Sequence, residues 1–294
     1  MIKRTISIEN PGKLSIKNSQ LLIEQDGTIT GHIPVEDIGV LVIDNPAILY
    51  THTCLTKLLE NNASVIICGP NHHPAGLLLP LDSNSVQSER FRFQIEASLP
   101  LKKQLWKQTI QAKVLNQAGL LKITGKENRK LKNIVKNIKT GDASNVEAQA
   151  ARYYWPDLFG KDFRRERYGK PPNNLLNYGY MVLRAAVARS LVSTGLLPTL
   201  SIHHKNKYNA FGLADDIMEP YRVYVDKTVH YIKKSFDDCS VMTKDIKKKL
   251  LEILVCDVEL KNKKHPLLVG LTHTTASLYR CFTKEQKEID YPLI

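Results

Sequence analysis

The alternation of apolar and polar positions changes near residue 80. Before that point, short and partly alternating apolar runs are separated by turn signals such as Asn18-Ser19 and Asp26-Gly27. The pattern predicts strands over residues 3–8, 13–16, 20–24, 28–32, 40–43, 64–68 and 77–79. One helix is predicted over residues 53–61, where Leu55, Leu58 and Leu59 stand at helical spacing.

Beyond residue 80 the apolar positions follow a helical period. Residues 81–86 have the composition of a linker that ends in a helix cap. Helices are predicted over residues 87–99, 101–120, 126–139, 143–155, 176–194, 221–235, 243–256 and 273–283. We therefore expect a two-domain α+β protein: a small N-terminal β-rich domain over residues 1–80, the linker, and a larger all-α domain over residues 87–294.

The charge balance narrows the choice of partner. The 294 residues include 42 Lys and Arg against 29 Asp and Glu, a net charge of +13. Such an excess favours a polyanion, either nucleic acid or an anionic membrane. No apolar run is long enough to span a bilayer, and no apolar segment follows the cations near the N-terminus as in a secretory signal. The five scattered cysteines form no Cys-x-x-Cys pair, which argues against a zinc finger or a disulfide framework and favours reduced thiols in the cytoplasm.

Three basic stretches lie in the predicted helical part. A single stretch of this kind is typical of a solvated helix face, but three on a chain of +13 favour contact with phosphates. No base-reading motif accompanies them, so recognition of nucleic acid shape is expected rather than of sequence. The stretches comprise Lys122, Lys126, Arg129, Lys130, Lys132, Lys136 and Lys139; then Lys161, Arg164, Arg165, Arg167 and Lys170; then Lys244, Lys247, Lys248 and Lys249.

The densest group of chemically active side chains lies in residues 203–222. On a helix, Glu219 would share a face with Asp216 (i,i+3) or with Asp215 (i,i+4). Carboxylates beside an apolar stripe need a cation, and His204 lies close upstream. This is the composition of a hard-cation site with one nitrogen ligand. A solvated acidic helix start with a chance histidine is the alternative, and these residues alone leave both open.

A third ligand is available in the stretch Gly141–Trp155. Ser144 or Asn145 is expected to cap this helix, which places Glu147 in its first turn among three alanines. Glu147 would then be partly desolvated, or it would simply complement the helix dipole. A second histidine pair, His72-His73, stands in a Gly- and Pro-containing loop and is interpreted as surface loop or interface.

Several motifs together resemble a known family. They are Asn-Val-Glu-Ala-Gln-Ala-Ala-Arg-Tyr-Tyr-Trp over residues 145–155, Asn-Tyr-Gly-Tyr over 177–180, the pair His203-His204, and Asn-Ala-Phe-Gly-Leu-Ala-Asp-Asp-Ile-Met-Glu-Pro-Tyr-Arg over 209–222. They are similar to the CRISPR-associated adaptation endonuclease and integrase, the first family of Cas proteins (Cas one), in its type II branch. The resemblance covers nearly the whole chain, since a β domain followed by a helical domain is also that family's plan.

The resemblance implies a metal-dependent enzyme that inserts spacer DNA into a CRISPR array. Its metal ligands fall on Glu147, His204 and Glu219, with Asp216 as an accessory acid, and the expected ion is Mg²⁺ or Mn²⁺. The attacking group would be the 3′-OH of incoming DNA for integration, or water for cleavage. Ser201 and Val223 depart from the family's usual Gly and Pro, which puts only local loop geometry in question.

The expected DNA contacts and partners complete this picture. Candidate DNA-binding residues are Arg152, Arg164, Arg165, Arg167 and Tyr178, whereas Tyr154, Trp155 and Tyr180 are expected in the core. The resemblance further implies double-stranded and branched DNA as substrate, a homodimer formed through the β domain, and a small partner protein (Cas two) in a four-to-two complex. The competing hypotheses are a non-catalytic nucleic-acid binder and a zinc hydrolase built on His203, His204 and a carboxylate, the latter disfavoured because adjacent histidines point apart on a strand.

Overall fold

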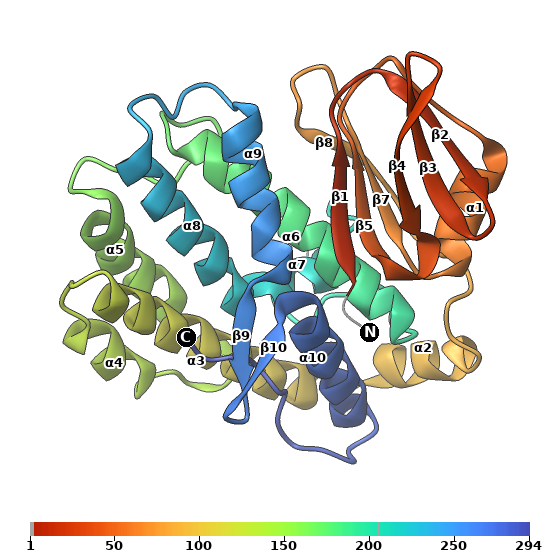
Figure 1. Cartoon of the computed structure of the whole chain (residues 1–294). Helices are drawn as coiled ribbons and strands as arrows, with labels where there is room; N and C mark the ends of the chain where they lie inside the picture. The colour runs from red at the N-terminus through yellow and green to blue at the C-terminus, as the bar shows by residue number, and fades with distance from the viewer. Residues whose placement is uncertain (1–2, 205) are drawn as a thin grey trace.

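A computed structural model describes residues 3–204 and 206–294 (Figure 1). Lys205, which belongs to the acidic and histidine-rich stretch, lies outside the described residues, as do Met1 and Ile2. Figure 1 shows the N-terminal strands gathered with α1 at one side of the molecule and most of the other helices at the other side. None of the described helices combines the length and apolar character needed to cross a bilayer.

The N-terminal part contains two sheets and one helix. The first sheet has the order β1 (Arg4–Ile8), β5 (Ile38–Ile43), β7 (Ser64–Cys68), β8 (Pro74–Leu78), and all of its neighbours are parallel except β7 and β8. The second has the order β4 (Thr28–Pro34), β3 (Gln20–Gln25), β2 (Gly12–Lys17), β6 (Ile48–Tyr50), with β6 parallel to β2. Helix α1 (His52–Glu60) is capped by the Thr51 side chain, which accepts from the Cys54 N–H.

Strand β5 connects the two hydrophobic cores of the molecule. All six of its residues are buried. Because side chains alternate along a strand, Leu41 and Ile43 face the core shared with the second sheet and α1, whereas Val40 and Val42 join the core of the helical part. The first sheet is therefore covered on both faces, as is usual for parallel strands.

The C-terminal part is mainly helical, as the periodicity predicts. Its helices are α2 (Gln87–Glu96), α3 (Leu99–Ile123), α4 (Arg129–Val135), α5 (Val146–Phe159), α6 (Asn173–Ser193), α7 (Gly212–Met218), α8 (Arg222–Ser235), α9 (Lys244–Leu251) and α10 (Leu267–Phe282), and a short 3₁₀ turn, η3 (Glu219–Tyr221), separates α7 from α8. One difference from the expected all-α part is an antiparallel hairpin of β9 (Asp257–Leu260) and β10 (Lys263–Pro266). Lys261 and Asn262 both have positive φ (50° and 61°), which suits a two-residue hairpin turn, and the hairpin lies between the helices predicted over residues 243–256 and 273–283.

Small residues allow α6 and α8 to cross closely. A Cβ placed on Gly179 would lie 2.4 Å from Cγ1 of Val225, so a larger side chain there would push α8 away. Asn116 of α3 fixes the same region from the other side, since its Nδ2 donates to the carbonyls of Pro220 (2.8 Å) and Pro292 (3.0 Å). These contacts determine where η3 presents Glu219.

Candidate functional site

Three elements bring the predicted acidic residues together in the helical part. Glu147 lies in the first turn of α5, Glu219 is the first residue of η3, and α3 passes between them. The connection between α6 and α7 carries His204. These segments lie far apart in the sequence and meet only through helix packing.

The start of α5 is built differently from the expected cap. Asn145 has a left-handed backbone (φ 51°) and no capping hydrogen bond, so the prediction that Ser144 or Asn145 caps the helix is wrong. Instead the carboxylate of Asp142 accepts from the N–H groups of Val146 (2.8 Å) and Glu147 (3.0 Å). A carboxylate at this position satisfies two backbone donors and matches the helix dipole. The Glu147 side chain is thereby left free to face α3.

Lys113 of α3 lies between the two glutamates. Its Nζ is 2.6 Å from Oε1 of Glu147 and 2.6 Å from Oε2 of Glu219. Burial alone would lower the pKa of Lys113, but the two carboxylates outweigh burial and raise it. The two carboxylates therefore favour the charged ammonium form of Lys113 between them. Lys113 is absent from the residues predicted from sequence, although a cation beside Val114 and close to Ile110 in a buried helix is a recognisable signal.

Glu219 is almost completely buried and has a second cationic partner. Its Oε1 lies 2.9 Å from NH2 of Arg222, while its Oε2 has no hydrogen-bond partner in the described structure despite the nearby ammonium. Burial would raise the pKa of Glu219, but Arg222 and Lys113 together hold that pKa below its ordinary value. Glu219 is therefore an ionised acceptor with an unused buried oxygen.

His204 is oriented by Asp216. Its Nδ1 lies 2.5 Å from Oδ1 of Asp216, whose other oxygen accepts from the N–H groups of Ile202 and His203. This hydrogen bond raises the pKa of His204 against the effect of burial, and the charges of Glu219 and Glu147 add to the increase. Because Asp216 accepts the Nδ1 proton of the neutral ring, Nε2 carries the lone pair available to a metal.

Asp216 therefore differs from its expected role as an accessory ligand. It is fully buried and already engaged with His204 and two backbone donors. Asp215 is also directed elsewhere, to a bidentate contact with Arg184 and a bond from Asn209. Glu219 is the acid of this stretch that faces Glu147 through Lys113.

His203 takes a position that separates it from its neighbour. Its ring stacks on Trp106 with centroids 4.2 Å apart and an interplanar angle of 3°, whereas the His203 and His204 rings are nearly perpendicular. Burial, and then the adjacent His204, lower the pKa of His203. Trp106 thus contacts both rings, stacked on His203 and edge-on to His204. Because the two histidine rings are nearly perpendicular, the arrangement argues against a zinc site that uses both.

The fit of these side chains to a divalent cation can be tested on their donor atoms. Among residues 3–204 and 206–294, no three His, Cys, Asp or Glu side chains are already arranged as a metal site. The Lys113 ammonium occupies the space that would join Glu147 to Glu219. The carboxylates of Glu147 and Glu219, the latter with an unpartnered Oε2, and the imidazole nitrogen of His204 form a donor set that suits Mg²⁺ or Mn²⁺. The residues therefore fit the ion.

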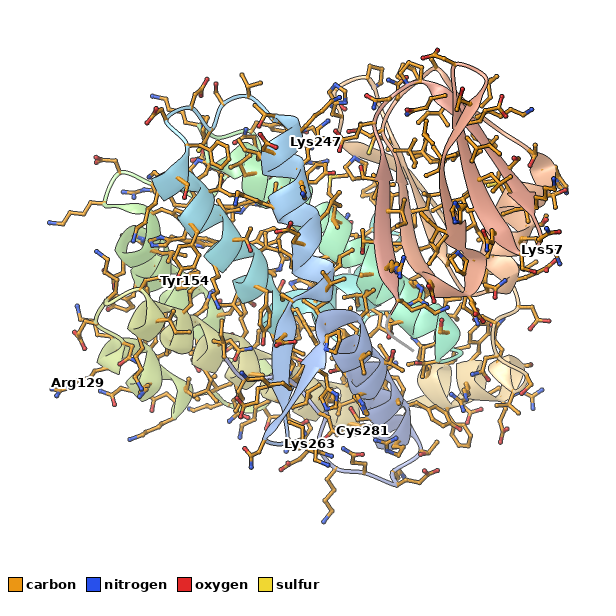
Figure 2. All side chains as sticks on the ribbon, viewed as in Figure 1. Lys57, Arg129, Tyr154, Lys247, Lys263 and Cys281 are labelled. Carbon is orange, nitrogen blue, oxygen red and sulfur yellow. The ribbon has the colours of Figure 1, made fainter. Side chains whose placement is uncertain are left out.

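A cavity of about 210 Å³ opens beside the glutamates. Its lining includes Asp226, whose carboxylate accepts hydrogen bonds from the hydroxyls of Tyr154 and Tyr180. Tyr154 lies within the helical part (Figure 2). Burial raises the pKa of Asp226 to about 6, against the opposing effects of both tyrosines and of Arg222. The cavity is lined by Lys113, Gln117, Glu147, Ala151, Trp155, Arg165, Tyr180, Glu219, Arg222, Val223 and Asp226.

The expected core aromatics are mostly in place. Tyr154 and Tyr180 are buried, and the half-buried Trp155 packs on Tyr154 and Phe159 at the cavity edge. Tyr178 is also fully buried and edge-on to His73, so its predicted role as a DNA contact is wrong. Tyr178 lies on the inner face of α6, so its side chain packs in the core and is not exposed to a ligand.

A larger polar groove adjoins the cavity and contains two of the candidate arginines. Arg165 stands in both, and donates to Asn173 and Asn177, while Arg167 lines only the groove. Arg152 and Arg164 are exposed elsewhere on α5 and on the following loop. The groove encloses about 1190 Å³, and its lining also includes Arg184, Arg222, Tyr168, Tyr208, Asn174, Asn206 and Asn209.

The third basic stretch is only partly exposed. Lys247 of α9 is buried, with its Nζ 2.6 Å from Oδ2 of Asp44 at the end of β5 (Figure 2). His72 contacts the other oxygen of Asp44 at 2.9 Å. Lys247 therefore joins the helical part to the β part, and a role in phosphate contact is excluded by its burial. The His72-His73 loop packs against the helical part at the same place.

Comparison with known proteins gives one consistent result. The family model described as CRISPR associated protein Cas1 matches residues 6–235. A CRISPR-associated endonuclease Cas1 from Neisseria meningitidis serogroup C is 36% identical over 100% of this chain and 97% of its own. Among solved structures, a casposase bound to integration product has a TM-score of 0.79, with 19% identity, over 99% of this chain and 93% of that one. A Cas6-RT-Cas1–Cas2 complex has a TM-score of 0.75 and 19% identity over 97% of this chain and 35% of that one.

Proposed function

Because this chain belongs to the Cas1 family, we propose that it is the metal-dependent DNA endonuclease and integrase of CRISPR adaptation. In this role it inserts spacer DNA into the array by attack of a 3′-OH on a phosphodiester of the repeat. The observation that carries the proposal is that Glu147 and Glu219, from distant parts of the sequence, both contact the Lys113 ammonium in a largely buried site. The similar Neisseria protein is named an endonuclease, and one structural neighbour holds an integration product.

Glu147, His204 and Glu219 are the proposed ligands of the ion. A bound Mg²⁺ or Mn²⁺ would polarise the scissile phosphate and align the attacking oxygen, and the nitrogen ligand favours Mn²⁺. Asp216 fixes the His204 ring so that Nε2 is the nitrogen offered. Arg222 keeps Glu219 ionised when the site is desolvated.

The chain's own cations are placed to hold the reacting phosphate. Arg165 and Arg222 both stand over the Tyr180 ring, with 5.2 and 4.6 Å from the guanidinium carbon to the ring centroid, and both line the cavity beside Glu219. A guanidinium fork binds phosphate oxygens in a fixed geometry. These groups would stabilise the negative charge on the phosphoryl oxygens in the transition state of either transesterification or hydrolysis.

The polar groove is the proposed path of the DNA strand toward the site. It combines arginines, which contact phosphates, with the exposed rings of Tyr168 and Tyr208, which offer stacking surfaces. Binding should therefore weaken steeply with salt. Arg152 and Arg164, and the exposed cations of α4, extend the positive surface beyond the groove.

We further propose a homodimer through the N-terminal β part, joined to the small Cas two partner in a four-to-two complex. Exposed apolar side chains on the second sheet support a protein contact, with Leu49 68%, Ile29 55% and Tyr50 45% exposed. One of the structural neighbours is itself a Cas6-RT-Cas1–Cas2 complex, which supports the choice of partner. The division of residues 1–80, 81–86 and 87–294 into dimerisation domain, linker and catalytic domain is part of the same proposal.

The deciding experiment separates catalysis from binding. Glu147→Gln and His204→Ala are assayed for Mn²⁺-dependent cleavage and strand transfer on branched DNA, with DNA affinity measured in parallel. We expect activity to fall to background in both while affinity stays near that of the wild type, and the exposed Glu127→Gln variant to retain activity. Retained activity in both site variants would remove these residues from the mechanism, and a wild-type protein that binds the DNA without cleaving or joining it would favour the non-catalytic binder.

A further inference from the structure

Lys113 is a buried cation that the proposed reaction does not account for. It comes from the middle of α3, contacts both glutamates at 2.6 Å, and has a side chain only 14% exposed. We propose that Lys113 is the resident counter-ion of the site: its ammonium competes with the divalent cation for Glu147 and Glu219, and it transfers to Gln117 when that cation binds. The inference rests on the proposed function, because it takes the two glutamates as cation ligands.

The charges of the site require such a counter-ion in the metal-free protein. Two ionised carboxylates this close in a desolvated site repel each other strongly, and a buried charge without a partner is costly. Arg222 reaches Glu219 at Oε1 but is not paired with Glu147. Lys113 is the cation shared by both acids, so it holds α5 and η3 together before a metal arrives.

The ammonium nevertheless fills this position imperfectly. It donates a hydrogen bond to Glu147, whereas Oε2 of Glu219 is at ion-pair distance but without hydrogen-bond geometry. An ammonium presents three N–H donors, whereas a divalent cation carries twice the charge and is bound directly by several oxygen ligands at once. A divalent cation can therefore displace Lys113 from the carboxylates.

Gln117 supplies the alternative partner for the displaced ammonium. It lies four residues after Lys113 on the same helix, and residues at this spacing are neighbours on the helix surface. Its Oε1 is buried and has no hydrogen-bond partner in the described structure. Both side chains line the same cavity, which has room for the flexible lysine stem to change rotamer. An unpaired acceptor one turn from a movable donor gives the ammonium a second place to bind.

The test compares metal binding with and without this competitor. Mn²⁺ binding to the full-length protein is measured by titration calorimetry and by the loss of the free Mn²⁺ electron paramagnetic resonance signal, using MnCl₂ alone. We expect Lys113→Met to bind Mn²⁺ about tenfold more tightly than the wild type, since a competing ligand of the carboxylates is gone. Lys107→Met, on the same helix and outside the ion pairs of the described residues, is the matched control and should bind as the wild type does.

Thermal unfolding gives an independent readout that does not depend on activity. Without metal, Lys113→Met should unfold at a lower temperature than the wild type, and Mn²⁺ should raise its unfolding temperature by more. Lys113→Arg retains the counter-ion and should not gain Mn²⁺ affinity. Gln117→Leu keeps the counter-ion but removes its second acceptor, so it should bind Mn²⁺ more weakly than the wild type.

The outcomes distinguish this inference from the proposed function. If Glu147→Gln abolishes Mn²⁺ binding while Lys113→Met binds Mn²⁺ no more tightly than the wild type, the metal site stands and the counter-ion role is overturned. If Glu147→Gln leaves Mn²⁺ binding unchanged, the proposed ligand set itself is wrong. Tighter binding by Lys113→Met together with weaker binding by Gln117→Leu supports both the competition and the transfer.

Discussion

The carboxylate of Asp216 contacts Nδ1 of His204 at 2.5 Å, and the charges of Glu219 and Glu147 act on the same ring. Asp216 is completely buried, and its second oxygen accepts from the N–H groups of Ile202 and His203. One carboxylate thus fixes both the ring and the backbone that carries it.

Asp216→Asn should reduce the function of the site without removing a proposed ligand. An amide cannot accept on both sides as the carboxylate does, so His204 loses its fixed orientation. Supporting partners of this kind typically contribute about 10–100-fold to metal affinity or activity. The Mn²⁺ affinity measured by calorimetry and the rate of strand transfer should each fall by about 10–100-fold. Wild-type values in both assays would show that the ring needs no such support.

The same pair predicts a pH dependence of stability. The hydrogen bond to Asp216 raises the pKa of His204 above 6.5 in the folded protein. The stability that protonated His204 contributes is therefore fully present below its pKa in the unfolded chain, and it is lost as pH rises through its pKa in the folded protein. The stability advantage of the wild type over Asp216→Asn, measured by urea unfolding without metal, should therefore shrink between about pH 6 and 8. An advantage that grows over this range would contradict the assignment.

Ionisation of Asp226 should also make the folded state less stable as pH rises, but over a lower pH range than His204. Burial raises its pKa from 3.8 to about 6, so the folded state loses stability as pH rises from the lower value through the upper one. Asp226→Asn cannot ionise and should show a flatter profile, with the wild type losing up to about 3 kcal/mol relative to it between about pH 4 and 7. Chemical denaturation across this range measures the difference. Parallel profiles would mean that Asp226 titrates normally.

Lys247→Met should destabilise the junction between the β part and the helices. Its removal leaves Asp44, which is 3% exposed, without its lysine partner, and the remaining contacts with His72 and the Cys68 thiol do not supply a permanent positive charge. Breaking a buried ion pair on one side typically costs about 3–5 kcal/mol. The double variant Lys247→Met with Asp44→Leu should recover much of the loss, and the exposed Lys248→Met should cost little. No recovery in the double variant would indicate that packing, not the unpaired charge, is responsible.

The groove tyrosines predict a selective loss of single-strand binding. Tyr208 and Tyr168 are 83% and 89% exposed at the groove, so neither contributes much to the core. Replacing each by Ala should weaken binding of a single-stranded oligonucleotide by roughly 1–3 kcal/mol if a base stacks on the ring. Tyr231→Ala, an exposed tyrosine of α8 outside the groove, serves as control in fluorescence anisotropy. Equal effects at all three positions would argue against the groove as the binding path.

Most strands and helices could be predicted from the sequence because they follow local periodicity, although β6, α7 and the β9–β10 hairpin were not among the predicted elements. Short apolar runs between turn signals placed β5 and the other predicted strands, and helical spacing placed α3, α6 and α8 within a few residues of their ends. The motif around residues 203–222, joined to Glu147 by family resemblance, also selected the glutamates that the structure brings together. These are properties of neighbouring residues, which a sequence records directly.

Which side chains face one another could not be predicted from the sequence, because it depends on how distant segments pack. Gly179 lets α8 pack closely on α6, and Asn116 of α3 fixes η3; together these contacts bring Glu219 to the side of α3 that carries Lys113, which also contacts Glu147. The same packing turns Asp216 to His204 and buries Tyr178. Spacing along one helix defines a shared face, but the neighbour of that face depends on how helices cross, and helix crossing is set by side-chain volumes contributed from distant parts of the chain.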